Sequence, residues 1–344
     1  MMKIASIESD INSLTQTLGI SRPEAIREIK ILFGYANKLD PVELIKEPSV
    51  MRDPLKLKKY KRFFNDRLTG KPVAYILGYK EFYGLCFNVN ECTLIPRPDT
   101  ELLVDLAIKK IQQHNLKKIL ELGTGSGSIA ISIATHLPNI QITATDISSN
   151  ALEVALGNAI NLCPNHTIEF KKSDWFSEIS GTFDLIVSNP PYIAEDDAYL
   201  KGDGIRYEPS IALTSGLLGL DALTLIVNQS KGFLDANGWL LLEHGYDQRD
   251  SCRHLLSAGG FTSLLDESDL GGNPRVSGGR IGVEVAKIIK SISRISRPAD
   301  DRACFTAGIA ISEGPIPGST YLLSFIPVLS LIHSSLVSIN FDKS

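Results

Sequence analysis

The sequence predicts an α/β protein in which a small helical domain precedes a doubly wound, Rossmann-like sheet. From about residue 117, short apolar runs typical of buried parallel strands alternate with stretches of helical spacing. This alternation indicates a doubly wound sheet. Residues 1–75 show helical spacing instead. The expected strands cover residues 118–122, 140–146, 167–170, 183–188 and 238–243, and the expected helices cover 129–137, 149–161, 220–233 and 248–258.

The length and composition fit a globular protein of two domains. The chain has 344 residues, of which 43% are hydrophobic and 22% are charged, so it can bury a substantial core. Its net charge of -4 gives no overall positive field that would attract nucleic acid. We divide the chain into a helical domain (1–75), a β-hairpin connector (76–100), a sheet domain (101–285) and a tail (286–344). The tail shows no clear periodicity, and we expect it to be poorly ordered and dispensable for catalysis.

The helical domain has a clear helix start and a basic stretch. Ser21 stands at an N-cap position, and Pro23 lies among the first helical residues. Further prolines, among them Pro54, divide the region into short helices. Five Lys and Arg residues recur at helical intervals between positions 56 and 62. They form either a solvated helix face or a docking face for an acidic macromolecule.

The connector has strand character. Apolar residues extend over 73–78 and alternate with polar ones over 81–89, which predicts a hairpin. Beyond it, Arg97 stands between two prolines, just before a helix that starts at Asp99 or Thr100. This arginine either forms a structural ion pair or lines the mouth of a site.

A glycine loop joins the first expected strand of the sheet to the next helix. The loop consists of Gly123, Thr124, Gly125, Ser126 and Gly127. Small residues in this place let a ligand approach the backbone closely. Ser128 stands where a dinucleotide fingerprint would have its third glycine, which favours a nucleoside with a compact tail over a pyrophosphate. About twenty residues later Asp146 ends the next strand, where a carboxylate can bind both hydroxyls of a ribose.

Two more segments follow the third and fourth strands. Asp174 and Trp175 come after the third, and Asn189-Pro190-Pro191-Tyr192 directly follows the strand 183–188. Because the carboxyl ends of parallel strands meet at one edge of a sheet, we expect these residues, the glycine loop and Asp146 to surround one crevice.

The tetrapeptide Asn189-Pro190-Pro191-Tyr192 can hold a planar NH2 group. Its two prolines end strand pairing and fix the backbone. The Asn189 side-chain carbonyl and the Pro190 main-chain carbonyl can then accept both hydrogens of one NH2, while the Tyr192 ring lies against the planar group. Such a device aims the nitrogen lone pair at an electrophile. The alternative is a stiff strand exit with an Asn turn.

These residues resemble the class I S-adenosylmethionine-dependent methyltransferases, whose Asn-Pro-Pro-Tyr turn marks members that methylate amino groups. Over about residues 1–280 the chain is similar to the bacterial release factor glutamine methyltransferases. That family shares the helical domain, the glycine loop, the tetrapeptide and segments like 72–78, 94–101 and 272–276. Its members usually end soon after the equivalent of Arg280, whereas this chain continues for more than sixty residues.

The resemblance implies a function for each part of the chain. Residues 1–75 would dock the substrate. The residues implied in binding S-adenosylmethionine are Gly123, Thr124, Gly125, Ser126, Gly127, Asp146, Trp175 and Asn189. The residues implied in binding the substrate glutamine are Arg97, Asn189, Pro190, Pro191 and Tyr192, of which Asn189, Pro190 and Tyr192 would be catalytic.

The implied reaction transfers a methyl group to the side-chain amide nitrogen of a glutamine in a peptide chain release factor. A rival interpretation is an adenine-N6 or guanine-N2 methyltransferase that holds a flipped base in the same turn. Residues 1–80 hold 15 Lys and Arg against 9 Asp and Glu, so the rest of the chain carries a net charge of -10. This acidic part and the absence of a long target-recognition insert argue against it. A non-enzymatic nucleoside-binding or scaffold protein would leave Asn189 and its prolines unexplained. We therefore expect release factors as partners and no stable binding of nucleic acid.

Cysteine and histidine usage predicts a cytoplasmic protein without a metal site. The five cysteines are scattered, with no pair at metal-ligand or redox spacing, as is typical of reduced thiols. The six histidines form no cluster. The N-terminus lacks the apolar core of a signal peptide. Residues 320–340 are apolar but contain a proline, a histidine and five serines, so we expect no membrane contact.

Overall fold

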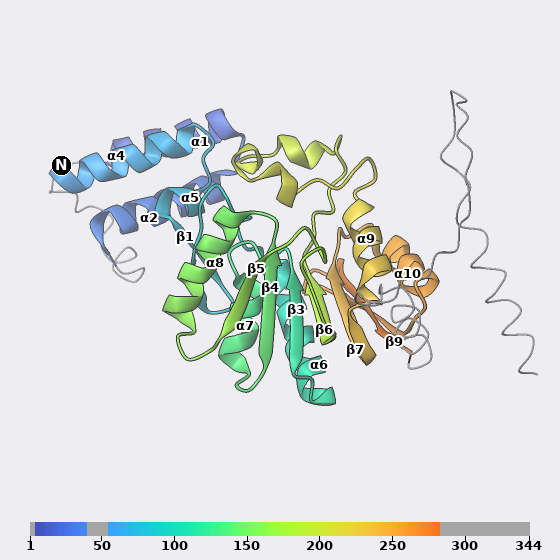
Figure 1. The fold of residues 1–344 in the computed structure, drawn as a ribbon. Helices are drawn as coiled ribbons and strands as arrows, with labels where there is room; N and C mark the ends of the chain where they lie inside the picture. Colours follow the sequence, from blue (N-terminus) through green and yellow to red (C-terminus); the bar gives the residue numbers. More distant parts are fainter. Residues whose placement is uncertain (1–3, 40–53, 283–344) are drawn as a thin grey trace, which may run out of the picture. The chain divides into compact units, whose positions relative to one another are not determined.

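The computed structural model describes residues 4–39 and 54–282, and Figure 1 shows its fold. The tail that we delimited at residues 286–344 lies outside the described residues. The N-terminal region contains the helices α1 (Ile4–Leu18), α2 (Arg22–Asn37) and α4 (Pro54–Leu68). Ser21 is the N-cap of α2, as predicted, and its hydroxyl accepts a hydrogen bond from the backbone N–H of Glu24.

The N-terminal helices enclose a hydrophobic core of their own. Leu14, Leu32 and Tyr60, one from each helix, are almost fully buried in it. The Phe33 and Tyr60 rings meet edge to face with their centroids 5.8 Å apart, which is a favourable arrangement. The five basic residues between positions 56 and 62 are all exposed on α4.

The segment 73–78 is not a strand, contrary to the prediction. It forms the short helix α5 (Val73–Leu77), which ends at Gly78 in the left-handed conformation. Its β-branched residues favour a strand locally, but several of its apolar side chains pack against the core of the N-terminal helices. Such packing outweighs local propensity. The predicted hairpin follows directly as β1 (Tyr79–Phe82) and β2 (Leu85–Asn88).

A seven-stranded sheet forms the centre of the described chain, in the order β5-β4-β3-β6-β7-β9-β8. The strands from β5 to β7 are parallel, and β9 and β8 complete the sheet in antiparallel orientation. The chain runs outward from β3 to β5 and returns to β6 on the other side of β3, which confirms the doubly wound topology. The strands are β3 (Lys118–Leu122), β4 (Gln141–Asp146), β5 (Ile168–Lys172), β6 (Phe183–Ser188), β7 (Leu234–Glu243), β8 (Phe261–Ser268) and β9 (Pro274–Ile281).

Helices cover both faces of this sheet (Figure 1). They are α6 (Glu101–His114), α7 (Ser128–His136), α8 (Ser149–Leu162), α9 (Asp221–Ser230) and α10 (Arg249–Ala258). Side chains of α6, α7 and α8 share one hydrophobic core with the sheet, and those of α9 and α10 share the other. Successive strand residues alternate between the cores, so that Ile119 faces the first and Leu120 the second.

The antiparallel strands β8 and β9 were not predicted from the sequence. Glycine is rare inside strands, and β9 contains Gly278 and Gly279. The structure explains Gly278, because a β-carbon there would lie 2.6 Å from the carbonyl oxygen of Leu240 on β7. Close approach of the β7 and β9 backbones therefore requires glycine at position 278. Because glycine is untypical of strands, the same residue makes β9 hard to recognise in the sequence.

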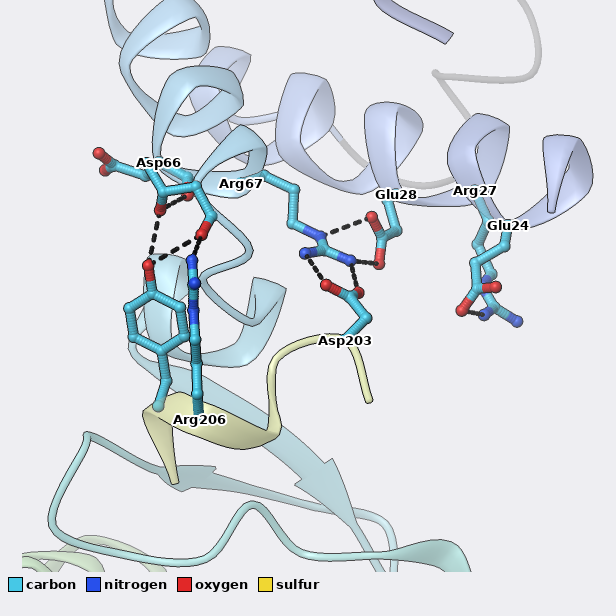
Figure 2. Close-up of polar contacts among 9 residues, drawn as sticks. Glu24, Arg27, Glu28, Asp66, Arg67, Asp203 and Arg206 are labelled. Carbon is cyan, nitrogen blue, oxygen red and sulfur yellow. Dashed lines mark hydrogen bonds and ion pairs between the residues drawn. The ribbon is translucent and has the colours of Figure 1, made fainter. Parts of the chain in front are cut away.

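A long loop joins β6 to α9 and contains the 3-10 turns η2 (Ala198–Lys201), η3 (Ile205–Tyr207) and η4 (Ser210–Ala212). Asp203 in this loop pairs with Arg67 of α4, whose Nε also donates to Glu28 of α2 at 2.8 Å (Figure 2). The Arg67 side chain is 3% exposed. This buried arginine thus connects the helical domain to the loop that follows Asn189-Pro190-Pro191-Tyr192.

Candidate active site

Two cavities lie at the carboxyl edge of the sheet. The first has a volume of about 350 Å³ and is lined by the glycine loop, the end of β4 and residues that follow β5 and β6. The second has a volume of about 460 Å³ and is lined by the β6–α9 loop and the ends of β7 and β9. Leu94, Asn189 and Ala212 belong to the walls of both. The two cavities therefore adjoin, and Asn189 stands at their shared wall.

The glycine loop leaves space for a ligand beside its backbone. Gly123 and Gly125 line the first cavity with φ angles of 71° and 56°. A β-carbon on either would meet no heavy atom within 4 Å beyond its chain neighbours, so a side chain there would project into open space. Gly127 differs, because its β-carbon would lie 2.8 Å from Cδ1 of Ile131 on α7. The left-handed backbone (φ 82°) and the close approach of Ile131 on α7 and Ala155 on α8, rather than a ligand, therefore favour glycine at position 127.

Thr124 and Ser126 anchor the loop and do not line the first cavity. The Thr124 hydroxyl donates a hydrogen bond of 2.7 Å to Oε2 of Glu121 on β3. The backbone carbonyl of Ser126 accepts a hydrogen bond of 2.9 Å from Asn158 on α8. Together with Gly127, these residues shape the loop that presents Gly123 and Gly125.

Asp146 is already held by backbone donors at the end of β4. Its carboxylate accepts hydrogen bonds of 2.9 Å from the N–H groups of Gly125 and Ser148. Burial raises the pKa of Asp146, and these backbone donors oppose the rise. Each carboxylate oxygen has a second lone pair that can accept from a ligand hydroxyl. The fixed carboxylate and the open glycine backbone in one cavity fit the nucleoside part of S-adenosylmethionine.

Trp175 lines the first cavity in an unusual backbone conformation. Its φ is 48°, in the left-handed region that bulky residues rarely adopt. The Ser173 hydroxyl donates a hydrogen bond of 2.8 Å to the Trp175 carbonyl. The half-buried ring contacts the core under α9 and α10. A large aromatic surface is therefore held at the wall of the first cavity.

The tetrapeptide divides its side chains between the two cavities. Pro191 lines the first cavity, Pro190 and Tyr192 line the second, and Asn189 lines both. Asn189 Nδ2 donates a hydrogen bond of 3.1 Å to the hydroxyl of Thr100. Within the described part of the chain, no donor reaches Asn189 Oδ1 or the Pro190 carbonyl. Both acceptors are therefore available to a ligand.

Tyr192 is fixed at both ends. Its hydroxyl donates a hydrogen bond of 3.3 Å to Oε1 of Glu243, the last residue of β7. Its carbonyl accepts a hydrogen bond of 2.9 Å from the side chain of Gln248. Burial, together with the nearby Glu243 carboxylate, raises the pKa of Tyr192, so the phenol keeps its proton at neutral pH. The ring is a rigid, half-buried part of the second cavity.

Arg97 combines the two roles that the sequence left open. Its guanidinium pairs with Glu208 of the β6–α9 loop, whose side chain is 2% exposed. The other carboxylate oxygen of Glu208 accepts a hydrogen bond of 3.0 Å from the backbone N–H of Ile95. Arg97 also lines the second cavity and is 29% exposed. It is thus a structural ion-pair partner that remains in reach of a ligand.

Sequence reasoning missed the buried polar residues that support this site. Glu121 lies in the middle of β3 and is 1% exposed, Asn158 on α8 is fully buried, and Glu243 is 1% exposed. Asn158 bonds both to Ser126 of the glycine loop and to Asn88 of the hairpin. A sequence signal exists for Glu121 and Glu243. Each is an acidic residue inside or at the end of an apolar strand, where a side chain is expected to be buried, and a buried acidic group needs polar partners.

The described residues show neither a metal-binding cluster nor a membrane-spanning helix. They contain no group of three or more His, Cys, Asp and Glu residues that could hold a metal ion. In the same residues, no helix is both long enough and apolar enough to cross a membrane.

Family models match two parts of the chain. Residues 11–78 match the PrmC N-terminal domain, and residues 99–201 match the methyltransferase small domain. The first match spans most of the N-terminal helices, and the second contains the glycine loop and Asn189.

Curated relatives match over most of their length. The release factor glutamine methyltransferase of Aliivibrio fischeri is 42% identical over 62% of this chain and 75% of its own. That of Bordetella pertussis is 41% identical over 71% and 87%, and that of Neisseria gonorrhoeae is 38% identical over 76% and 96%. Among solved structures, a methyltransferase from Pyrococcus furiosus is 18% identical over 66% of this chain and 98% of its own, with a TM-score of 0.44.

Proposed function

Because this chain belongs to the release factor glutamine methyltransferase family, we propose that its two cavities bring a methyl donor and a glutamine side chain together at Asn189. The enzyme uses S-adenosylmethionine and methylates the side-chain amide nitrogen of a glutamine in peptide chain release factors. The observation that carries the assignment of the site is the position of Asn189 in the wall that both cavities share.

The first cavity is the cofactor site in this proposal. S-adenosylmethionine, when bound, supplies a methyl group on a positively charged sulfur. Asp146 accepts hydrogen bonds from the ribose hydroxyls, and the backbone at Gly123 and Gly125 gives the ligand close access. Trp175 covers the ligand with its ring. Support comes from the lining of the cavity by all four residues and from the open space beside both glycines.

The second cavity receives the glutamine. Asn189 Oδ1 and the Pro190 carbonyl accept its two amide N–H groups, and the fixed Tyr192 ring restricts its plane. An amide nitrogen is a poor nucleophile because its lone pair is delocalised. Two acceptors hold the nitrogen in one orientation, and most of the rate comes from such positioning and from electrostatics. The nitrogen would form a bond to the methyl carbon as the carbon–sulfur bond of the donor breaks and leaves a neutral thioether. The nitrogen would afterwards lose one proton to water.

We place the reaction in the cytoplasm, on a protein partner. The described cysteines Cys86, Cys92, Cys163 and Cys252 are all free thiols, as expected in a reducing compartment. The helical domain serves as the docking surface for the release factor, and Arg97 contacts the bound segment. No stable nucleic-acid complex is part of this function, since the chain carries a net charge of -4.

Transfer of a labelled methyl group tests the proposal. The full chain is incubated with labelled S-adenosylmethionine and one of three acceptors: a release factor, the same factor with the target glutamine replaced by asparagine, or a DNA and RNA mixture. We expect label only in the unaltered factor. Label in nucleic acid, or equal label in the asparagine variant, would contradict the assignment of the second cavity to glutamine.

A further inference from the structure

The side chain of Gln248 holds several backbone groups, although it lines neither cavity. Gln248 stands directly before α10, and its side chain makes no capping hydrogen bond to that helix. Instead, Nε2 donates a hydrogen bond of 2.9 Å to the carbonyl oxygen of Tyr192, and Oε1 accepts one of 2.9 Å from the N–H group of Gly245. Gln248 therefore connects the end of the tetrapeptide to the segment that follows β7.

The same amide reaches a third segment, residues 215–221. Nε2 lies 3.4 Å from the carbonyl oxygen of Leu218 and 3.3 Å from that of Gly219, so these two longer hydrogen bonds share the donor with Tyr192. Gly219 has a φ of 69°, and a β-carbon there would lie 2.2 Å from the Tyr192 carbonyl oxygen. Glycine at this position thus lets the segment lie directly against Tyr192.

The partners of Gln248 determine the orientation of its amide. The three carbonyl oxygens can only accept hydrogen bonds, and the Gly245 N–H group can only donate. A rotated amide would place its oxygen against the carbonyl oxygens and its NH2 group against the Gly245 N–H. Among the described residues, no other donor reaches the Tyr192 carbonyl. Loss of the Gln248 donor would therefore leave that carbonyl without a protein partner.

The segments that Gln248 connects belong to both cavities. Tyr192 and Gly245 line the second cavity. Ser215 and Asp221, at the two ends of the segment 215–221, line the first. A shift of Tyr192 relative to this segment would thus move a wall of one cavity against a wall of the other.

We propose that Gln248 is a positioning residue that keeps Tyr192 and the segment 215–221 in fixed relative positions and so aligns the glutamine with the methyl donor. The inference deepens the proposed function and rests on it, since it requires the second cavity to hold the glutamine and the first to hold the donor. Methyl transfer needs the nitrogen and the methyl carbon in close contact. A misplacement of about 1 Å can lower the rate by a factor of about 10².

Three substitutions at Gln248 separate its donor from its acceptor. Gln248→Met has a similar length and neither group. Gln248→Glu keeps an acceptor for Gly245 but turns a carboxylate oxygen towards the carbonyl oxygens, whereas Gln248→Lys keeps a donor for the carbonyls and loses the acceptor. We expect kcat to fall about 10-fold in Gln248→Met, about 10- to 100-fold in Gln248→Glu and less than about 3-fold in Gln248→Lys.

The KM for S-adenosylmethionine provides a second readout. It should rise about 2- to 5-fold in Gln248→Met and Gln248→Glu, because the segment 215–221 loses its attachment beside the first cavity. Gln113 is the matched control, since it is an exposed glutamine on α6 that lines neither cavity. The same three substitutions at Gln113 should leave kcat and KM at their wild-type values.

A double variant tests whether Gln248 acts on kcat through Tyr192. In a Tyr192→Ala background, Gln248→Met should lower kcat by less than about 2-fold further, because no ring remains to be positioned. The KM for S-adenosylmethionine should still rise in the double variant, because the segment 215–221 is released in the same way.

The outcomes distinguish the inference from the function that it rests on. Wild-type kcat and KM in Gln248→Met and Gln248→Glu would overturn the inference alone, as would a loss in Gln248→Lys as large as that in Gln248→Glu. A Gln248→Met loss of kcat that persists in full beside Tyr192→Ala would also overturn it. Wild-type kcat in Tyr192→Ala would instead overturn the role of Tyr192 in the proposed function.

Melting temperatures separate a loss of positioning from a loss of folded protein. Calorimetry gives the melting temperature of each variant, and all rates are measured below the lowest of them, where every compared variant is folded. If Gln248→Glu does not fold, the comparison of Gln248→Met with Gln248→Lys still decides whether the donor matters, and equal kcat in these two variants would contradict the inference.

Discussion

The two cavities are built in different ways. The first is shaped largely by backbone: open glycines, a carboxylate held by N–H groups and the fixed position of Trp175. The second is built from side chains that pair with one another over long sequence distances, such as Arg97 with Glu208 and Tyr192 with Glu243. Substitutions in the first cavity should therefore change affinity for the cofactor, whereas those in the second should change the orientation of the substrate and kcat.

The largest expected effect lies at the wall between the cavities. Asn189→Ala removes an acceptor of a glutamine N–H and frees the nucleophile to rotate, so kcat should fall by a factor of about 10² to 10⁴. The affinity for S-adenosylmethionine should change little, since Asp146, Trp175 and the glycine loop remain. Asn189→Asp should be milder, because a carboxylate oxygen still accepts the hydrogen. Single-turnover methylation of release factor at saturating cofactor gives the rates of both variants. A near-wild-type rate in the alanine variant would mean that the tetrapeptide is only a stiff turn without a catalytic role.

The matching effect in the first cavity concerns cofactor affinity. Asp146→Ala removes a carboxylate that can accept two hydrogen bonds from a ribose, which should weaken S-adenosylmethionine binding by about 2–4 kcal/mol. Asp174→Ala is a suitable control, because Asp174 lines the same cavity but is exposed; its effect should be below about 1 kcal/mol. Calorimetric titration gives both affinities. Equal affinities of the two variants for S-adenosylmethionine would show that Asp146 does not bind the cofactor.

Arg97 tests whether ion pairs in the second cavity also bind substrate. Arg97→Met leaves the buried Glu208 carboxylate without its partner, which should cost about 2 kcal/mol of folding free energy. Adding Glu208→Gln removes the unpaired buried charge and should restore most of that stability. KM for release factor should remain raised about 3- to 10-fold in the double variant if Arg97 contacts substrate, as the proposed function requires. A double variant with wild-type stability and KM would leave Arg97 a structural role only.

The contrast between a cavity shaped by backbone and one built from side-chain pairs also explains which features could be predicted from the sequence. Gly123 and Asn189 directly follow a recognisable apolar strand and Asp146 ends one, so topology alone places them at one edge of the sheet. The pairing of Thr100 with Asn189 depends on how the start of α6 meets the end of β6, 89 residues away, and no local pattern encodes that contact. The helix at 73–77 was mistaken for a strand for a related reason, since its partner is the core of the N-terminal helices.

The smallest expected effect on catalysis concerns the buried Glu121 carboxyl group beneath the glycine loop, whose titration changes stability. Burial raises the pKa of Glu121 from its ordinary value near 4.5 to about 8, so the folded protein holds a proton that the unfolded chain releases. Because the folded state then binds more protons, stability falls as pH rises from about 4.5 to 8 and levels off above.

Glu121→Gln cannot ionise and should escape this loss. Its melting temperature should lie close to that of the wild type near pH 5 and exceed it by about 5–10 °C at pH 8.5. The control Glu169→Gln changes an exposed carboxylate on β5 and should produce no such divergence. A melting temperature difference that stays constant between pH 5 and 8.5 would mean that Glu121 is already ionised in the folded protein. The glycine loop would then be held by a buried charge, and Thr124 and the backbone N–H of Ala130, which both donate to Glu121, would be its stabilising partners.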